Sequence, residues 1–406
     1  MDYIKKPYIP ASHYKNILSY QYKGGDLSLT YIYFISPLCN KLVSYFPLWL
    51  APNVITITGF FLNISYVLVT LSYTGFKGGV DIPPWACIFC ALCYFTYNIL
   101  DNCDGKQARR TNSSSPLGLL VDHGTDACTT FFIAIGLGSI IAVNNIWFYG
   151  MIFLMTSSAF YLSTWEEYVT GELILPVFNG VSDGMVLVVI IEVFTAFAKS
   201  EFWLGNIYIL GFNVCYNQFL CFLGMCGGIF FSLLSIYNVF KKADVDKVLK
   251  NLVHIIFYIF FYISFACVAS LGSKSYVVDN YPKIVILLYG FLFAKVMGLL
   301  QLAHIMNGDF QPYTFITLPP LICLTLYSII YNWFDVTLFI SIDILLIFFF
   351  FLNFAAWVHF VRNCSKEMCN VLNINVLSIS TRNPSDNQQV EVQIANLEEK
   401  KVDIAV

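Results

Sequence analysis

Long apolar segments recur along almost the whole chain, and they restrict the folds that it can adopt. About ten of them reach the roughly 20 residues with which a helix crosses the hydrocarbon layer of a membrane. Hydrophobic residues make up 58% of the chain and charged residues 12%, a composition for which a soluble domain has no need. The sequence therefore predicts an all-α, polytopic integral membrane protein.

The apolar segments also divide the chain. The predicted spans cover residues 54–74, 84–103, 117–142, 147–166, 181–198, 205–239, 252–272, 283–306, 313–332 and 336–361. Residues 1–24 form a polar tail. Residues 25–50 mix aromatic side chains with Pro37, Lys41 and Pro47, which favours an amphipathic helix on the membrane surface, with a packed connector as the alternative. Residues 51–200 and 201–362 hold two groups of spans, and residues 363–406 are predicted to be a polar, mostly disordered tail.

One polar stretch interrupts this pattern and carries Asp101, Asp104, Asp122 and Asp126 at the facing ends of two successive predicted spans. Carboxylates in such a place are costly unless they are paired or bind a cation. A spacing of three residues puts the first two on one face of a helix end. A spacing of four stacks Gly118 with the last two on one face of the next helix. Because oxygen ligands suit Mg²⁺, Mn²⁺ or Ca²⁺ better than zinc, the stretch predicts a divalent-metal site.

The residues between the acidic pairs indicate a phosphate ligand. Gly105 and Gly118 have no side chain and would let a bulky phosphate approach the backbone. Lys106, Arg109 and Arg110 supply positive charge, and arginine can bind a phosphate through two parallel hydrogen bonds. A metal, a diphosphate and group-transfer chemistry are therefore predicted together.

This stretch resembles the signature of the CDP-alcohol phosphotransferase family. The matching residues are Asp101-x₂-Asp104-Gly105-x₂-Ala108-Arg109-x₈-Gly118-x₃-Asp122-x₃-Asp126. The run from Asp104 to Gly118 looks like the eukaryotic choline/ethanolamine phosphotransferase branch, as do W-L-A-P-N-V-I-T at 49–56 and T-W-E-E-Y at 164–168. Beyond residue 185 or so the resemblance rests mainly on the hydrophobic pattern.

The resemblance implies an enzyme that transfers phosphocholine and/or phosphoethanolamine from CDP-choline or CDP-ethanolamine to diacylglycerol, releasing CMP. Residues 51–200 would form the catalytic core, and residues 201–362 would provide lipid access and dimer contacts. Asp101, Asp104, Asp122 and Asp126 would hold one or two Mg²⁺ or Mn²⁺ ions. The resemblance also implies a homodimer in the membrane of the endoplasmic reticulum, or of the Golgi. Nothing in the sequence indicates nucleic acid as a partner.

By the same resemblance, the CDP-alcohol would contact Asn53, Thr56, Gly105, Lys106, Ala108, Arg109 and Gly118. Helix capping is the alternative role for Asn53. Two alternatives stay open for the base that deprotonates the acceptor hydroxyl. Asp126 would be weakened as a base by metal binding, and His123 lacks the Glu that many relatives carry one turn earlier, where this chain has Leu119.

Two further sets of residues are candidates. Trp165, Glu166 and Tyr168, with Glu167 between them, could bind the head group, because aromatic rings and carboxylates attract a quaternary ammonium, although an interfacial aromatic belt would look the same. The second set comprises ionisable residues in or near spans: Asp183, Glu192, Lys295, His304 and Asp343. Asp183 and His304 are expected near the site. Glu192 and Asp343 are expected to make structural or dimer contacts. Lys295 fits a role in helix pairing and a role in catalysis equally well.

Lysine and arginine residues gather at the span ends that share a side with the Asp101–Asp126 stretch, which predicts that this stretch and both termini face the cytosol. Three alternatives to the predicted activity remain. One is a different alcohol or lipid acceptor within the same family. A membrane prenyltransferase also uses aspartates and Mg²⁺ but lacks the Gly-x₂-Ala-Arg element. A cation transporter would place acidic groups in broken helices of matching halves rather than at the ends of two successive spans.

Overall fold

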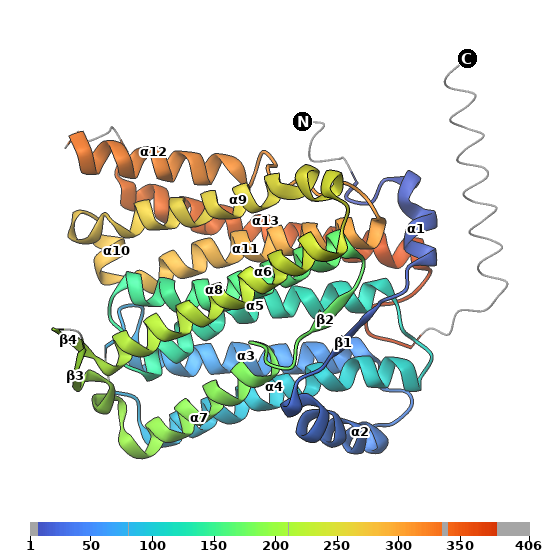
Figure 1. Ribbon diagram of the computed structural model, residues 1–406, viewed down its shortest axis with the longest axis horizontal. Coiled ribbons are helices and arrows are strands. Elements are labelled where there is room, and N and C mark those ends of the chain that lie inside the picture. Colours follow the sequence, from blue (N-terminus) through green and yellow to red (C-terminus); the bar gives the residue numbers. More distant parts are fainter. Residues whose placement is uncertain (1–6, 80, 210, 335–339, 380–406) are drawn as a thin grey trace.

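The computed structural model describes residues 7–79, 81–209, 211–334 and 340–379. Long helices lie side by side along one common direction and form a single bundle (Figure 1). In chain order they are α3 (Pro52–Thr74), α4 (Pro84–Arg110), α5 (Pro116–Ile140), α6 (Ile146–Thr170), α7 (Ser182–Ala198), α8 (Tyr216–Lys242), α9 (Val245–Ala269), α11 (Pro282–Met306), α12 (Leu318–Phe334) and α13 (Ile342–Leu372). Among the described helices, seven are long and apolar enough to cross a membrane: α3, α4, α6, α8, α9, α11 and α13. The prediction of an all-α, polytopic membrane protein is confirmed.

Shorter elements connect these helices. They are η2 (Ala11–His13), α1 (Tyr14–Ser19), β1 (Gly24–Asp26), η3 (Tyr31–Ile35), α2 (Ser36–Tyr45), β2 (Leu173–Leu175), η4 (Ser200–Leu204), β3 (Asn206–Ile209), β4 (Phe212–Cys215), η5 (Gly272–Lys274) and α10 (Tyr276–Asn280). The predicted span at 205–239 therefore begins too early. Its beginning instead holds the antiparallel pair of β3 and β4, and Gly211, just before β4, takes a φ of 88° that favours glycine.

The last helix is longer than the predicted span. α13 continues to Leu372, so the predicted boundary of the polar tail at residue 363 falls inside a helix. Cys364, Met368 and Leu372 recur every four residues and are buried against α1 and the end of α11, which keeps the helix packed although its other faces are polar. Residues 336–339 of the predicted span and 380–406 of the predicted tail lie outside the described residues.

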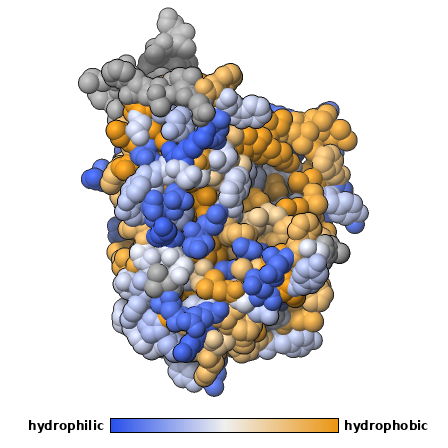
Figure 2. All heavy atoms as spheres, turned by 90° about the vertical axis from the view of Figure 1, so that its left-hand side faces the viewer, coloured by the Kyte–Doolittle hydropathy of each residue, from blue (hydrophilic) through white to orange (hydrophobic). Residues whose placement is uncertain are grey.

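Both ends of the described chain lie at the same end of the bundle as the Asp101–Asp126 stretch (Figure 1). The backbone N–H of Ile9 donates to Glu367 at 2.8 Å, and the Asn53 side chain donates to the carbonyl of Val376 at 2.9 Å. The opposite end carries β3, β4 and α10. Figure 2 shows hydrophilic residues through the middle of that end and hydrophobic residues mainly on its right-hand side.

The N-terminal segment is clamped to the bundle near the same end. β1 pairs in parallel with β2, and Asp26 accepts hydrogen bonds from Ser182 and Asn179. α2 buries Cys39 and Val43 against α4 and leaves large apolar side chains of the neighbouring residues, such as Trp49, exposed. This two-faced arrangement is that of the predicted amphipathic segment, whose position at a membrane surface stays a prediction.

The most buried long helix is α11, which packs on α5, α6 and α13. Small residues let it approach its neighbours closely. A Cβ added to Gly290 would lie 2.4 Å from the ring of Phe131 on α5, closer than van der Waals contact permits. α11 therefore holds α5, and with it the aspartate-bearing turn, against the rest of the bundle.

Candidate functional site

Three aspartates from two helices converge at this end of the bundle. One carboxylate oxygen from each of Asp101 on α4 and Asp122 and Asp126 on α5 lies within 4.8 Å of the others. The local sequence explains how α5 is placed, because Pro116 occupies its first turn and Ser115 accepts a hydrogen bond from the Gly118 N–H at 3.2 Å. Because α5 begins at Pro116, Asp122 and Asp126, which are four residues apart, lie on the same face of the helix and are directed towards Asp101 on α4.

The donor set fits a hard divalent cation. Asp101 Oδ1 and Asp122 Oδ1 are buried and have no hydrogen-bond partner within the described structure. Buried carboxylates without partners are costly, and a cation between them removes that cost. The convergent ligands are all oxygen atoms, which suits Mg²⁺ or Mn²⁺.

Two hydroxyl groups hold the aspartates in place. The Tyr97 hydroxyl donates to Asp126 Oδ1 at 2.6 Å. Thr56 Oγ1 donates to Oδ2 of Asp104, which is 8% exposed and lies outside the convergent set of three. Hydroxyls that orient metal ligands in this way are typical of the surroundings of metal sites. Thr56, predicted as a nucleotide contact, therefore also has a role in orienting an aspartate.

The two glycines of the motif leave open space beside the aspartates. A Cβ at Gly105 would meet only Arg109 Nη1, at 3.6 Å, and a Cβ at Gly118 would meet Asn53 Oδ1 at 3.6 Å and Ser115 Oγ at 3.8 Å. The Arg109 guanidinium and the Asn53 amide therefore flank the two glycines. This is a cradle that could receive a phosphate.

The remaining predicted nucleotide contacts lie on the same turns of α4. Ala108 is half-buried there. Lys106 points towards the N-terminal segment instead, where its Nζ donates to Ser36 Oγ at 3.0 Å and lies 5.8 Å from the centre of the Tyr31 ring.

Both candidate bases are present beside the cluster. Asp126 accepts the hydrogen bond from Tyr97, and His123 is 7% exposed, with its ring centre 5.9 Å from that of Phe160. The Nδ1 atom of His123 has no hydrogen-bond partner in the described structure. The geometry therefore leaves the choice between the two open.

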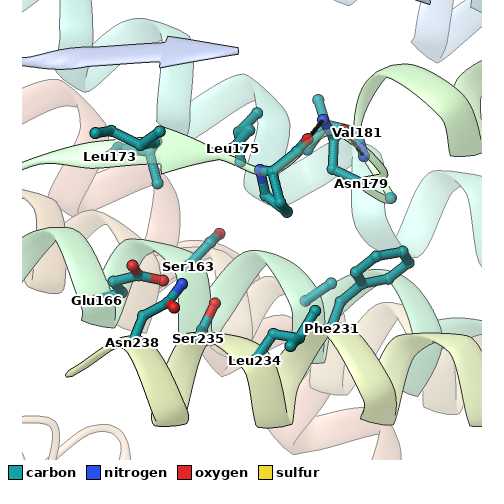
Figure 3. A pocket seen from close by; sticks show the side chains of 14 residues that line it. Ser163, Glu166, Leu173, Leu175, Asn179, Val181, Phe231, Leu234, Ser235 and Asn238 are labelled. Atoms are coloured by element: carbon teal, nitrogen blue, oxygen red, sulfur yellow. Dashed lines mark hydrogen bonds between the residues drawn. The ribbon is translucent and has the colours of Figure 1, made fainter. Parts of the chain in front are cut away.

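The predicted head-group residues point in different directions. Figure 3 shows Glu166 facing Ser163, Ser235 and Asn238 in a small crevice between α6, α8 and β2. Glu166 also lies 4.0 Å from Lys242.

Two more of the head-group candidates are engaged elsewhere. Tyr168 faces the segment after α11, where its hydroxyl donates to the carbonyl of Gly308 and accepts from the N–H of Phe310. Trp165 is fully buried, and its Nε1 has no partner within the described residues.

The fourth candidate, Glu167, faces the interior. Its Oε1 lies 3.5 Å from Nε2 of His304 on α11, and its side chain is 1% exposed. Successive residues on a helix point about 100° apart, so Glu166 and Glu167 must face different neighbours. Which of the two faces inward depends on how α6 packs.

Two other ionisable groups hold helices together. Asp183 accepts hydrogen bonds from Thr30 Oγ1 at 2.5 Å and from the Asn179 N–H at 3.0 Å, so it clamps the N-terminal segment to the start of α7. Glu192 accepts from the Tyr66 hydroxyl at 2.8 Å and joins α7 to α3.

Two more lie away from the aspartates. Asp343 caps α10 through Ser275 and the Val277 N–H, at the end of the bundle opposite the motif. Lys295 is 3% exposed in the middle of α11.

Comparison with known proteins identifies the family of this chain. A family model described as CDP-alcohol phosphatidyltransferase matches residues 49–210. The chain is 31% identical to "Uncharacterized CDP-alcohol phosphatidyltransferase class-I family protein 1" of Dictyostelium discoideum, over 93% of this chain and 97% of that protein. It is also 31% identical to choline/ethanolaminephosphotransferase 1 of Arabidopsis thaliana, over 73% and 79%, and 29% identical to cholinephosphotransferase 1 of Danio rerio, over 92% and 96%. The chain belongs to the CDP-alcohol phosphatidyltransferase family.

Proposed function

We propose that this protein transfers phosphocholine and/or phosphoethanolamine from the CDP-alcohol to diacylglycerol, forming phosphatidylcholine or phosphatidylethanolamine and CMP. The observation that carries the proposal is the convergence of Asp101, Asp122 and Asp126 beside an open glycine cradle at one end of the bundle. The printed names of relatives such as those from Arabidopsis thaliana and Danio rerio support this choice of substrates.

Asp101, Asp122 and Asp126, with Asp104 beside them, would hold one or two Mg²⁺ or Mn²⁺ ions. When bound, these ions would neutralise negative charge on the diphosphate and on the departing CMP. Tyr97 and Thr56 keep two of the carboxylates oriented through their hydroxyl groups.

The other residues of the site position the substrates and move one proton. Arg109 and the glycine cradle bind the diphosphate. The 3-hydroxyl oxygen of diacylglycerol forms a bond to the phosphorus that carries the amino alcohol, and the bond from that phosphorus to the oxygen of CMP breaks. The hydroxyl proton goes to Asp126 or His123. Because the acceptor attacks directly, no covalent enzyme intermediate is needed.

The location follows from the substrates. We propose that the nucleotide enters from the cytosol, that diacylglycerol enters sideways from the bilayer, and that both termini face the cytosol. The endoplasmic reticulum and a homodimeric state are proposed on the family resemblance.

The test is product formation by the purified protein in detergent, with diacylglycerol, Mg²⁺ or Mn²⁺, and CDP-choline and CDP-ethanolamine supplied separately. We expect product from at least one donor, and none after treatment with EDTA. Asp122→Asn should abolish transfer while the protein remains in the membrane. Near-normal activity of this variant would refute the metal site, and CMP binding without either product would indicate another alcohol or acceptor.

A further inference from the structure

A second buried carboxylate lies close to the aspartate cluster and lacks a cation. Both side-chain oxygens of Glu167 are buried and make no hydrogen bond within the described structure. His304 is 3.5 Å away, and no lysine or arginine among the described residues lies within ion-pair distance. A buried, unpaired carboxylate destabilises a fold, so its presence favours a ligand that brings the missing positive charge.

The groups around Glu167 are suited to a ligand rather than to one another. Gln301 lies beside the carboxylate on α11, one turn before His304, but neither of its amide atoms makes a hydrogen bond of good geometry. The Tyr20 hydroxyl lies 3.0 Å from His304 Nε2, so the N-terminal segment covers this place. Glu166, one residue earlier, differs in that it faces Ser235 and has a lysine, Lys242, 4.0 Å away, although its Oε1 makes no hydrogen bond within the described structure.

This place borders the aspartate cluster. Glu167 lies in the last turn of α6, and Asp122 lies near the start of α5. These two helices pack against each other, and the end of α6 and the start of α5 lie at the same end of the bundle (Figure 1). In agreement with this placement, burial and then the carboxylates of Glu167 and Asp122 raise the pKa of the Tyr22 hydroxyl. A ligand in the aspartate cluster that extends towards the end of α6 would therefore approach Glu167.

We propose that Glu167, assisted by Gln301, binds the ammonium group of the donor's amino alcohol. The inference rests on the proposed function. In both CDP-alcohols two carbon atoms separate the ammonium nitrogen from a phosphate oxygen, so the nitrogen has to lie a few ångströms from the bound diphosphate. Glu167 offers the negative charge at that place, and it replaces Glu166 as the head-group residue.

The acceptor set favours a primary ammonium. Ethanolamine presents three N–H donors, and the two Glu167 oxygens and the Gln301 amide oxygen are three acceptors without partners. Choline has no N–H group and is recognised mainly by the faces of aromatic rings. The rings of Tyr20 and Tyr22 lie near this place, but the groups there that lack partners are the carboxylate and amide oxygens, so we infer a preference for CDP-ethanolamine.

The experiment compares kcat/KM for the two donors in the wild type and in Glu167→Gln. The wild type should prefer CDP-ethanolamine. The variant should lose about 10- to 100-fold with this donor, chiefly through KM, because a charge-assisted hydrogen bond is lost, and should lose less with CDP-choline. Affinity for CMP, measured by calorimetry, should not change, because CMP has no ammonium group.

Three further measurements make the result decisive. Without ligand, Glu167→Gln should unfold at the wild-type temperature or higher, since a buried unpaired charge is gone; a lower temperature would indicate a structural role and overturn the proposal. Gln301→Met should shift the donor ratio in the same direction, which keeps the test valid if the first variant misfolds. Glu172→Gln, an exposed carboxylate paired with Lys242, controls for loss of one negative charge at this end.

The remaining outcomes are also distinguishable. Equal losses with both donors, or no loss with either, would overturn the ammonium assignment while leaving the proposed function intact. A changed donor ratio in Glu166→Gln rather than Glu167→Gln would restore the head-group site predicted from the sequence. No product from either donor in the wild type would refute the proposed function, and the ammonium subsite with it.

Discussion

Replacing Tyr97 by phenylalanine tests whether the aspartate cluster works as a metal site. The change removes one hydroxyl group, which donates to Asp126 Oδ1 at 2.6 Å, and keeps a ring that is only 2% exposed. A hydrogen bond to a charged group contributes about 1.5–3 kcal/mol. Loss of a group that orients a metal ligand costs about 10- to 100-fold in metal affinity or activity. We therefore expect the Mn²⁺ or Mg²⁺ concentration for half-maximal transfer to rise by such a factor in Tyr97→Phe.

The assay is a metal titration of the purified protein after EDTA treatment and dialysis, with the transfer rate as readout. Tyr149→Phe is the matched control. Tyr149 is fully buried and donates a neutral hydrogen bond to the carbonyl of Val143 at 2.9 Å, at the opposite end of the bundle. Its loss should cost about 0.5–1.5 kcal/mol of stability and leave the metal titration unchanged.

Two results would contradict this reasoning. If Tyr97→Phe titrates like the wild type, the hydroxyl does not orient a metal ligand. If Tyr149→Phe shifts the titration as much as Tyr97→Phe, the effect comes from general loosening of the bundle rather than from the aspartate cluster.

Two further predictions use neighbouring positions as controls. Thr56→Val removes the hydroxyl that orients Asp104 and should lower kcat/KM by about 10- to 100-fold. In the control, Thr58→Val, the hydroxyl faces outward and bonds within its own helix, so kcat/KM should stay near the wild-type value. Gly228→Ala places a Cβ 2.7 Å from the backbone of α6 and should destabilise the protein by about 1–3 kcal/mol, whereas Gly227→Ala meets nothing within 4 Å and should not; thermal unfolding measures both. Equal behaviour within either pair would refute the corresponding contact.

The helical bundle could be predicted because its signal is local. A run of about 20 apolar residues identifies a span wherever it occurs. The same rule misplaced the end of the last helix, where the residues become polar but one helix face is still buried. The polar residues Arg362 and Asn363 predicted the end of the last helix, but Cys364, Met368 and Leu372 continue its buried face for another ten residues.

The aspartate motif could also be predicted, since spacings of three and four residues put side chains on one face whatever surrounds the helix. The side chains that orient the aspartates were harder to predict from the sequence. Tyr97 lies inside an apolar run, and only the close packing of α4 on α5 shows that its hydroxyl meets Asp126. Gln301 has no local signal at all, because the carboxylate beside it, Glu167, lies on α6, more than a hundred residues earlier.

Apolar length and helical periodicity thus determined, from the sequence alone, that this chain is a bundle of membrane helices with an aspartate cluster at the ends of two of them. The tertiary structure decided which way α6 is rotated, so that Glu166 faces Lys242 and Glu167 faces α11. The physical reason is that adjacent glutamates are equivalent in any local pattern. Only the packing of α6 against α8 and α11 decides which carboxylate meets a lysine and which remains buried without a cation.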